Sequence, residues 1–364
     1  MNYIQNPNFP TRYICPEKLF DFLQTNYSDH ISLIGKSELG RPIFKMKLGD
    51  GIIKIAAWSQ MHGNESNATL AMLDLLEMMK RNSGFESRLL GKITLDFIFM
   101  LNPDGAAKWT RLNAADIDLN RDFHKQESKE LNYLLKLIES NQYEYALNLH
   151  EQRTIFSTNG IHPATLSFLA PSENFERSVT PTRKKMMAVI AQVSRKLEKV
   201  IPNQIARYSD EFYPSSVGDN FTKMGIPTIL FEGGHFQNDY ERIHTRKYYT
   251  FALAEALLAI AELDGSIRGW EDYFLIPENK ETHVDLIYRN VALNADFDAS
   301  FDIAVQYKEE VKDSSENISF TPIVVEAAST VRKNGWKEID CYGKKFISPR
   351  KFPKIDSEVD FTFE

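Results

Sequence analysis

Four continuous apolar runs of strand length stand out in the first 262 residues of the chain. They cover residues 52–58, 93–101, 143–149 and 226–231. Their apolar residues are consecutive and do not alternate with polar ones, as expected of strands that helices cover on both faces. This pattern predicts a largely parallel sheet buried between helices.

Amphipathic segments of helical spacing lie between and around these runs. They predict helices near residues 16–26, 65–81, 128–140, 182–200 and 248–263. In the fourth, apolar residues from Met186 to Val200 recur at helical spacing, and Pro202 ends the pattern. Two shorter strand-like segments, 30–35 and 42–49, precede the first buried run.

The pattern changes after about residue 269. Residues 301–307 alternate apolar and polar side chains, and segments 318–327 and 358–364 also favour strands. A length of 364 residues suits one large domain and an appendage. We therefore predict a domain over residues 1–268 and a small β-rich domain over residues 269–364, whose role the sequence leaves open.

Composition narrows the class of protein. Hydrophobic residues make up 43% of the chain, charged residues 26%, and the net charge is −7. No basic cluster suggests a nucleic-acid or membrane partner. The N-terminal residues do not resemble a signal peptide, and the two cysteines, Cys15 and Cys341, suit a reducing compartment, so we expect a cytoplasmic location. The oligomeric state stays open.

Three residues that can bind a metal follow separate apolar runs. His62 and Glu65 come after the first run, and His150 follows the third. Ligands gather at the carboxyl ends of strands in a parallel sheet, so we expect these side chains to converge. Two imidazoles and a carboxylate suit a catalytic Zn²⁺, one per chain, with a position left for water. The pair His124 and Glu127 has the same spacing but lies in a polar stretch, where a solvated pair is expected.

A further carboxylate, Glu232, ends the fourth run. At the same sheet edge it suits a general base that takes a proton from the zinc-bound water and returns it to a leaving amine. The alternative is a structural carboxylate that caps the turn before Gly233 and Gly234.

The segment 102–123 supplies polar groups near the same edge. Asn120 and Arg121 suit a clamp for the terminal carboxylate of a substrate, and Arg111 suits stabilisation of an oxyanion. Alternatively, both arginines pair with nearby surface acids: Asp116, Asp118 or Asp122.

The order of the motifs HGNE, NPDG, TRLNAADIDLNRDF, His150 and ILFEGG resembles the zinc carboxypeptidase (funnelin) family over residues 35–235. The resemblance implies an α/β/α sandwich around a mixed, mostly parallel sheet. It also implies the site roles given above: His62, Glu65 and His150 as zinc ligands, Glu232 as base, Arg111 as oxyanion stabiliser, and Asn120 with Arg121 as carboxylate anchors. The family also has a mobile tyrosine over the substrate; Tyr208 and Tyr213 both qualify, and we favour Tyr213.

Three functions fit these residues. The leading hypothesis is a zinc metallocarboxypeptidase that releases a C-terminal amino acid from a peptide. A deacylase acting on N-acyl amino acids would use the same groups. A binding protein without catalysis is less favoured, because no expected ligand or base is missing.

Overall fold

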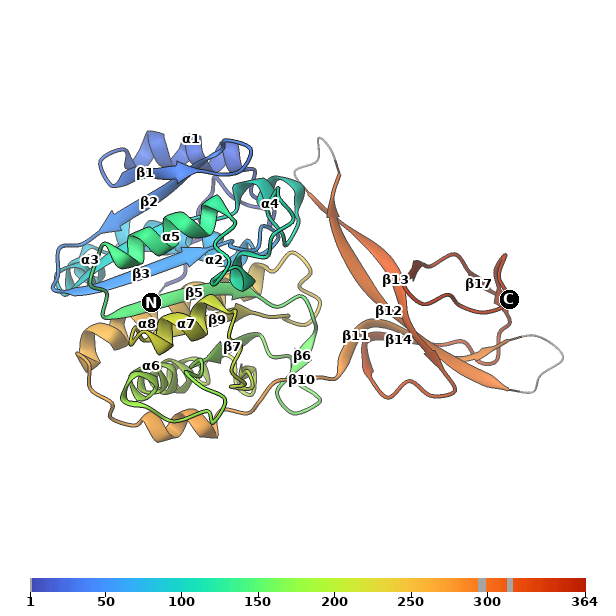
Figure 1. Cartoon of the computed structure of the whole chain (residues 1–364). Helices are drawn as coiled ribbons and strands as arrows, with labels where there is room; N and C mark the ends of the chain where they lie inside the picture. The colour runs from blue at the N-terminus through green and yellow to red at the C-terminus, as the bar shows by residue number, and fades with distance from the viewer. Residues whose placement is uncertain (1, 294–298, 313–316) are drawn as a thin grey trace.

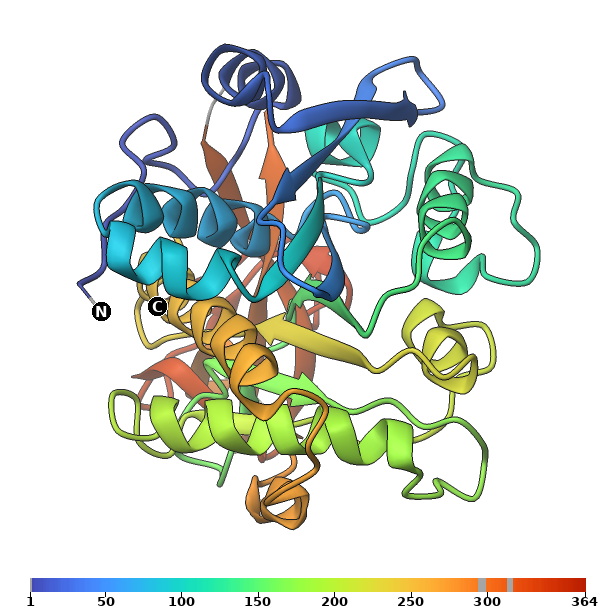
Figure 2. The ribbon, with the colours of Figure 1, turned by 90° about the vertical axis from the view of Figure 1, so that its left-hand side faces the viewer.

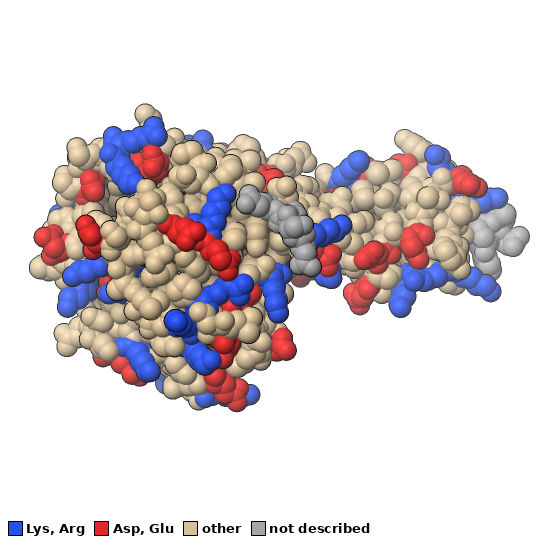
Figure 3. All heavy atoms as spheres, turned by 90° about the horizontal axis from the view of Figure 1, so that it is seen from above, with Lys and Arg blue, Asp and Glu red and all other residues tan. Residues whose placement is uncertain are grey.

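The computed structural model describes residues 2–293, 299–312 and 317–364. A large sheet flanked by helices forms one part of the molecule, and C-terminal strands project from one side of it (Figure 1). Lys and Arg side chains lie among Asp and Glu side chains on the face seen in Figure 3. In the described ranges, no helix is long and apolar enough to cross a membrane.

The central sheet has eight strands in the order β1-β2-β4-β3-β5-β9-β7-β8. The strands are β1 (Ile31–Lys36), β2 (Pro42–Leu48), β3 (Ile53–Ser59), β4 (Ile93–Phe99), β5 (Tyr145–Glu151), β7 (Leu166–Leu169), β8 (Ile205–Arg207) and β9 (Thr228–Gly233). At the middle of the sheet, β4 pairs with β3, β3 with β5, and β5 with β9, and each of these three pairs is parallel. The predicted mixed, mostly parallel sheet is thereby confirmed.

Helices cover both faces of this sheet (Figure 2). The helices are α1 (Pro16–Tyr27), α2 (Asn67–Lys80), α3 (Ser83–Leu90), α4 (Pro103–Lys108), α5 (Lys129–Glu139), α6 (Pro181–Leu197), α7 (Val217–Lys223) and α8 (Ile243–Leu263). One apolar cluster joins α2, α3, α6 and α8 to the sheet, and a second joins α5 and α7 to its other face. The predicted three-layer α/β/α sandwich is therefore present.

All five predicted helices form, with shifted ends. Helix α2 begins at Asn67, two residues after the predicted start, and α8 begins at Ile243, before the predicted residue 248. Helices α3, α4 and α7 escaped prediction because none exceeds eight residues, too short for a clear periodic pattern.

The C-terminal strands form a separate five-stranded sheet in the order β14-β11-β12-β13-β16. They are β11 (His283–Ala292), β12 (Ser300–Val311), β13 (Ile318–Ala328), β14 (Asn334–Asp340) and β16 (Ser357–Glu358); the short strands β6 (Phe156–Ser157) with β10 (Lys280–Glu281), and β15 (Phe346–Ile347) with β17 (Thr362–Phe363), form two further pairs. This sheet has apolar clusters of its own. We call residues 283–364 the C-terminal module.

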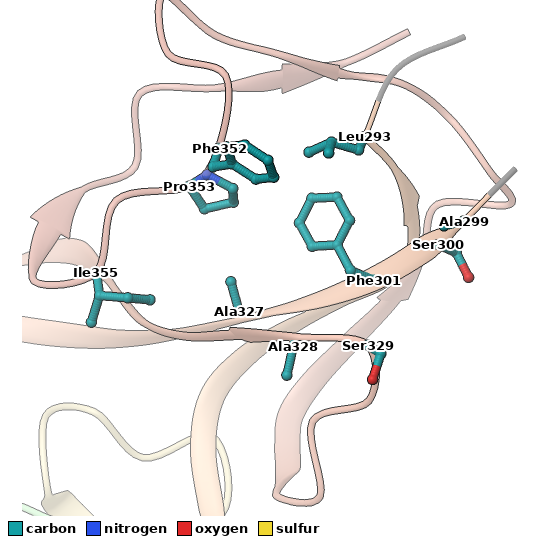
Figure 4. A pocket seen from close by; sticks show the side chains of 10 residues that line it. All are labelled: Leu293, Ala299, Ser300, Phe301, Ala327, Ala328, Ser329, Phe352, Pro353 and Ile355. Carbon is teal, nitrogen blue, oxygen red and sulfur yellow. The ribbon is translucent and has the colours of Figure 1, made fainter. Parts of the chain in front are cut away.

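The C-terminal module contains an apolar cavity of about 510 Å³ (Figure 4). Phe301, Ala327, Phe352 and Ile355 line it, and Phe352 is 61% exposed.

The division into two domains, with a boundary between residues 268 and 269, stays a proposal. The short 3₁₀ helix Trp270–Leu275 follows this boundary but packs beside α6. Its Tyr273 is buried in the apolar cluster between the eight-stranded sheet and helices α2, α3, α6 and α8.

A buried ion pair joins helix α8 to helix α2. Arg246 of α8 donates from Nε to Asp74 Oδ2 of α2 at 2.7 Å, and a second contact joins Arg246 Nη2 to Asp74 Oδ1. The Tyr3 hydroxyl and the Asn6 backbone also donate to Asp74. Both charged side chains are buried, so each depends on its partner.

We expect Asp74→Asn to lower the free energy of unfolding by about 3–5 kcal/mol, because Arg246 would keep a buried charge without a counterion. Urea denaturation followed by circular dichroism measures this loss. Arg81→Ala, which breaks the exposed pair of Arg81 with Glu77, should cost only about 0–1 kcal/mol. Equal losses in the two variants would show that the buried pair does not have this role.

Candidate active site

The predicted site residues meet at the carboxyl ends of three neighbouring parallel strands. His62 lies three residues beyond the end of β3, His150 lies in β5, and Glu232 lies in β9. His150 and Glu232 are direct partners in the parallel pairing of β5 with β9. The structure therefore brings together groups that the sequence separates by up to 170 residues.

His62, Glu65 and His150 form a tight buried cluster. Glu65 Oε1 lies 2.8 Å from His62 Nδ1, and Glu65 Oε2 lies 3.0 Å from His150 Nδ1. The two Nδ1 atoms are 3.2 Å apart. Ligands of tetrahedral zinc at bonds of about 2.0–2.1 Å stand about 3.3 Å apart, so the spacing suits a shared metal ion. Among the described residues this is the group of histidine and acidic side chains that fits a metal.

Asp118 fixes the orientation of His62, a contact that sequence reasoning missed. His62 Nε2 donates to Asp118 Oδ1 at 3.1 Å. A His62 that holds a metal would be neutral, with its proton on Nε2 and the lone pair of Nδ1 directed to the cluster. Nitrogen and oxygen lone pairs then face one another, an arrangement that a cation stabilises. The sequence suggested Asp118 only as a surface partner of the arginines.

Burial and neighbouring charges act in opposite directions on Glu65. Burial raises the pKa of this carboxyl, but the charge of His62 and hydrogen bonds from both imidazoles hold its pKa well below the ordinary value. The backbone N–H of Glu151 also donates to Glu65 Oε2 at 3.1 Å. Glu65 is therefore held as a carboxylate, the form that binds a metal.

Glu232 lies in the same cavity with a different environment. Burial, and then the negative charge of Glu65, raise the pKa of Glu232 well above its ordinary value, while Arg111 opposes the shift. Its buried Oε2 has no hydrogen-bond partner within the described part of the chain. A buried carboxyl oxygen with no structural partner is unlike a turn cap and is available to a ligand or water.

The loops that carry HGNE and NPDG are held together by a close backbone approach. A Cβ at Gly63 would lie 2.0 Å from the carbonyl carbon of Gly105, so only glycine fits there. Asn102 caps α4 by accepting from the Gly105 N–H at 2.9 Å, and its amide donates to the Arg111 carbonyl at 3.3 Å. This packing sets the path of the chain that leads to Arg111.

The cluster opens into a cavity of about 390 Å³, which we call the active-site cavity. Arg111, Asn120, Arg121 and Tyr213 all line it, together with the cluster residues. Arg111 pairs with Asp118 at 3.0 Å and also lies 3.5 Å from Glu65, so it both has an acidic partner and faces the cavity.

The clamp candidates differ in how firmly they are held. Asn120 is buried, and its Oδ1 accepts from the Val217 N–H at 3.2 Å. Arg121 donates to the Asn120 carbonyl, and its guanidinium lies 5.6 Å from the Tyr213 ring centre. Tyr213 is 50% exposed.

Four further side chains, from Tyr208, His235, His124 and Arg153, have clear partners. Tyr208 lines the cavity and donates to Gln152 Oε1 at 3.0 Å. His235 Nε2 lies 2.9 Å from Arg242 Nη2 and 3.4 Å from the Arg153 carbonyl oxygen. His124 bonds the exposed Pro214 carbonyl, as expected of a surface residue. Arg153 lines the cavity and pairs with Glu309.

The sequence matches the model of the zinc carboxypeptidase family over residues 17–254. The chain therefore belongs to the zinc carboxypeptidase family. The family implies a Zn²⁺ cofactor, and the His62, Glu65 and His150 cluster offers a place that could hold it.

Solved structures of similar fold include a protein named as a carboxypeptidase and one with a different name. A metallo-carboxypeptidase from Burkholderia cenocepacia has a TM-score of 0.55 and 16% identity, covering 68% of this chain and 69% of the other. Bovine thrombin-activatable fibrinolysis inhibitor has the same TM-score and identity over 69% of this chain and 98% of its own. At these identities the likeness shows the fold.

Curated relatives match a shorter stretch. Carboxypeptidase 2 of Trichophyton rubrum and the protein of that name from Trichophyton tonsurans are each 30% identical over 100 residues, which is 27% of this chain and 19% of theirs. The match thus spans about a fifth of the length of these relatives.

We expect the purified protein to bind one zinc ion per chain and His150→Ala to lose most of it, because the variant removes one of three ligands. Plasma mass spectrometry after dialysis measures the zinc content, and a melting curve checks folding. His124→Ala removes a surface imidazole and should keep its zinc. A folded His150→Ala protein with the full zinc content would place the metal elsewhere.

Proposed function

We propose that this chain is a zinc metallocarboxypeptidase that releases the C-terminal amino acid of a peptide. The observation that supports it most is the buried His62, Glu65 and His150 cluster beside Glu232, in one cavity with the Asn120 and Arg121 pair. The family to which the chain belongs supports the same class of reaction.

We assign the metal to His62 Nδ1, Glu65 and His150 Nδ1. Bound zinc would lower the pKa of a coordinated water and polarise the scissile carbonyl. The protein's own contribution is to hold the three ligand atoms within bonding range of one point, with Asp118 keeping the tautomer of His62 that exposes Nδ1.

Glu232 is the proposed proton carrier. Glu232 lines the cavity, and its buried Oε2 has no bond to a described protein group, so the protonation of this oxygen can change without breaking a hydrogen bond. In this role Glu232 accepts a proton from the attacking water and delivers it to the amine that leaves, which balances the hydrolysis of the peptide bond.

The arginines are proposed to orient the substrate. Arg121 and Asn120 would hold the terminal carboxylate, because guanidinium and amide donors match its two oxygens. Arg111 would face the carbonyl oxygen of the scissile bond, where its charge stabilises the developing oxyanion. Tyr213, half exposed and stacked near Arg121, is the proposed cover over the substrate.

The substrate is proposed to be a peptide. The family does not favour the deacylase alternative for N-acyl amino acids. The cytoplasmic location also remains a proposal, supported by the sequence alone.

Replacing Glu232 with Gln should lower kcat by two or more orders of magnitude, the usual size of a general acid and base contribution. Zinc content should stay close to that of the wild type, because Glu232 is not an assigned ligand. Glu127→Gln, at an exposed acid outside the cavity, is the matched control. Undiminished turnover in Glu232→Gln would remove this residue from the mechanism.

A comparison of two substrates separates the peptidase from the deacylase. We expect amino-acid release from a tripeptide with a free carboxylate, and much slower release from an N-acetyl amino acid and from the C-terminally amidated tripeptide. Quantitative amino-acid analysis of the products, with and without a zinc chelator, provides the measurement. Faster cleavage of the N-acetyl amino acid would establish the alternative activity.

A further inference from the structure

One acidic residue of the C-terminal module enters the catalytic part of the molecule. Glu309 of β12 has a side chain only 8% exposed, and its Oε1 lies 2.9 Å from Nη1 of the fully buried Arg12. Its Oε2 pairs with Arg153 and accepts from the Trp109 indole at 3.3 Å. Arg12 in turn pairs with Glu151, the neighbour of His150.

These contacts fix the position of the module. The charges of Arg12 and Arg153 outweigh the effect of burial and hold the pKa of Glu309 well below its ordinary value. A buried, paired carboxylate is costly to separate from its partners, so the contact is not a loose one. Strand β12 is therefore held in a fixed position beside the active site.

A second cavity of about 380 Å³ lies along β12, and we call it the module cavity. Arg111, Arg153 and Thr154 line both this cavity and the active-site cavity, so the two adjoin. Asn120 and Arg121 line only the active-site cavity. The module cavity thus adjoins the active-site cavity at Arg111 and Arg153 and does not reach the proposed carboxylate clamp.

Three aromatic rings form part of the module cavity. Tyr240 from the loop after β9 lies 5.4 Å from Tyr307 of β12 and 5.4 Å from Phe320 of β13, between ring centres. Asp285 holds this arrangement, because it accepts from the Tyr240 hydroxyl at 2.8 Å and from the Tyr307 N–H at 2.7 Å. All three rings are partly exposed, so they offer aromatic surface to a ligand.

From these contacts we propose that the C-terminal module completes the substrate site: the module cavity binds the part of the peptide upstream of the scissile bond and prefers a large aromatic side chain there. The proposal rests on the proposed function, which places the terminal carboxylate at Asn120 and Arg121. A peptide anchored there must extend its upstream residues past the cluster, and the adjoining module cavity has the volume and aromatic surface to take one.

The test compares two peptides that differ upstream only: acetyl-Phe-Ala-Xaa and acetyl-Gly-Ala-Xaa, with the same C-terminal residue Xaa. In the wild type, kcat/KM should be roughly tenfold higher for the Phe peptide, an effect of about 1.4 kcal/mol that is within the range for burying an aromatic side chain. Phe320→Ala should reduce this ratio to near one.

Phe352→Ala is the matched control, because Phe352 is an exposed aromatic residue of the same module that lines the other cavity. It should keep the wild-type ratio. Equal turnover of the two peptides by the wild type, or an unchanged ratio in Phe320→Ala, would overturn the proposal.

A binding measurement separates this proposal from the proposed function. If neither peptide is hydrolysed, the carboxypeptidase assignment fails, and isothermal titration of the same two peptides then decides the role of the module cavity. Tighter binding of the Phe peptide that Phe320→Ala abolishes would support the cavity as a peptide site. Equal binding of both peptides would refute it.

Discussion

The parallel alignment of β3, β5 and β9 is the constraint on which the rest of the structure depends. Neighbouring parallel strands end at the same edge, so the residues that follow them must lie close together. The direct pairing of His150 with Glu232 places a candidate ligand beside a candidate base without any contribution from loops. A shift of one residue in this pairing would turn one of the two side chains to the other face.

Buried charges in this molecule come in compensated sets. Glu65 lies between two imidazoles, and Glu309 lies between Arg12 and Arg153. Removing one member would leave an uncompensated charge in a low-dielectric interior. The same property holds the site rigid, because moving any group breaks several ion pairs. Glu232 Oε2 is different, since within the described residues it has no partner.

Much of this architecture could be predicted from the sequence, because its main elements are long and periodic. The four apolar runs became the parallel strands β3, β4, β5 and β9, and the three ligand candidates converge as the strand ends required. The contact of Asp118 with His62 could not be predicted, because 56 residues separate the two and the local sequence offers nearer arginines. The ion pairs of Glu309 with Arg12 and Arg153 could not be predicted either, since the alternating pattern of a strand does not show which distant residues its side chains contact. The choice between Tyr208 and Tyr213 still rests on the resemblance, because both line the same cavity.

The central claim is that one zinc ion is held by residues from β5 and from the loop after β3. X-ray diffraction from crystals of the purified protein, collected on both sides of the zinc absorption edge, tests it directly. We predict a single anomalous peak within about 2.0–2.2 Å of His62 Nδ1, His150 Nδ1 and a Glu65 oxygen. A zinc peak bonded to other residues, with these three side chains in contact only with one another, would contradict the account.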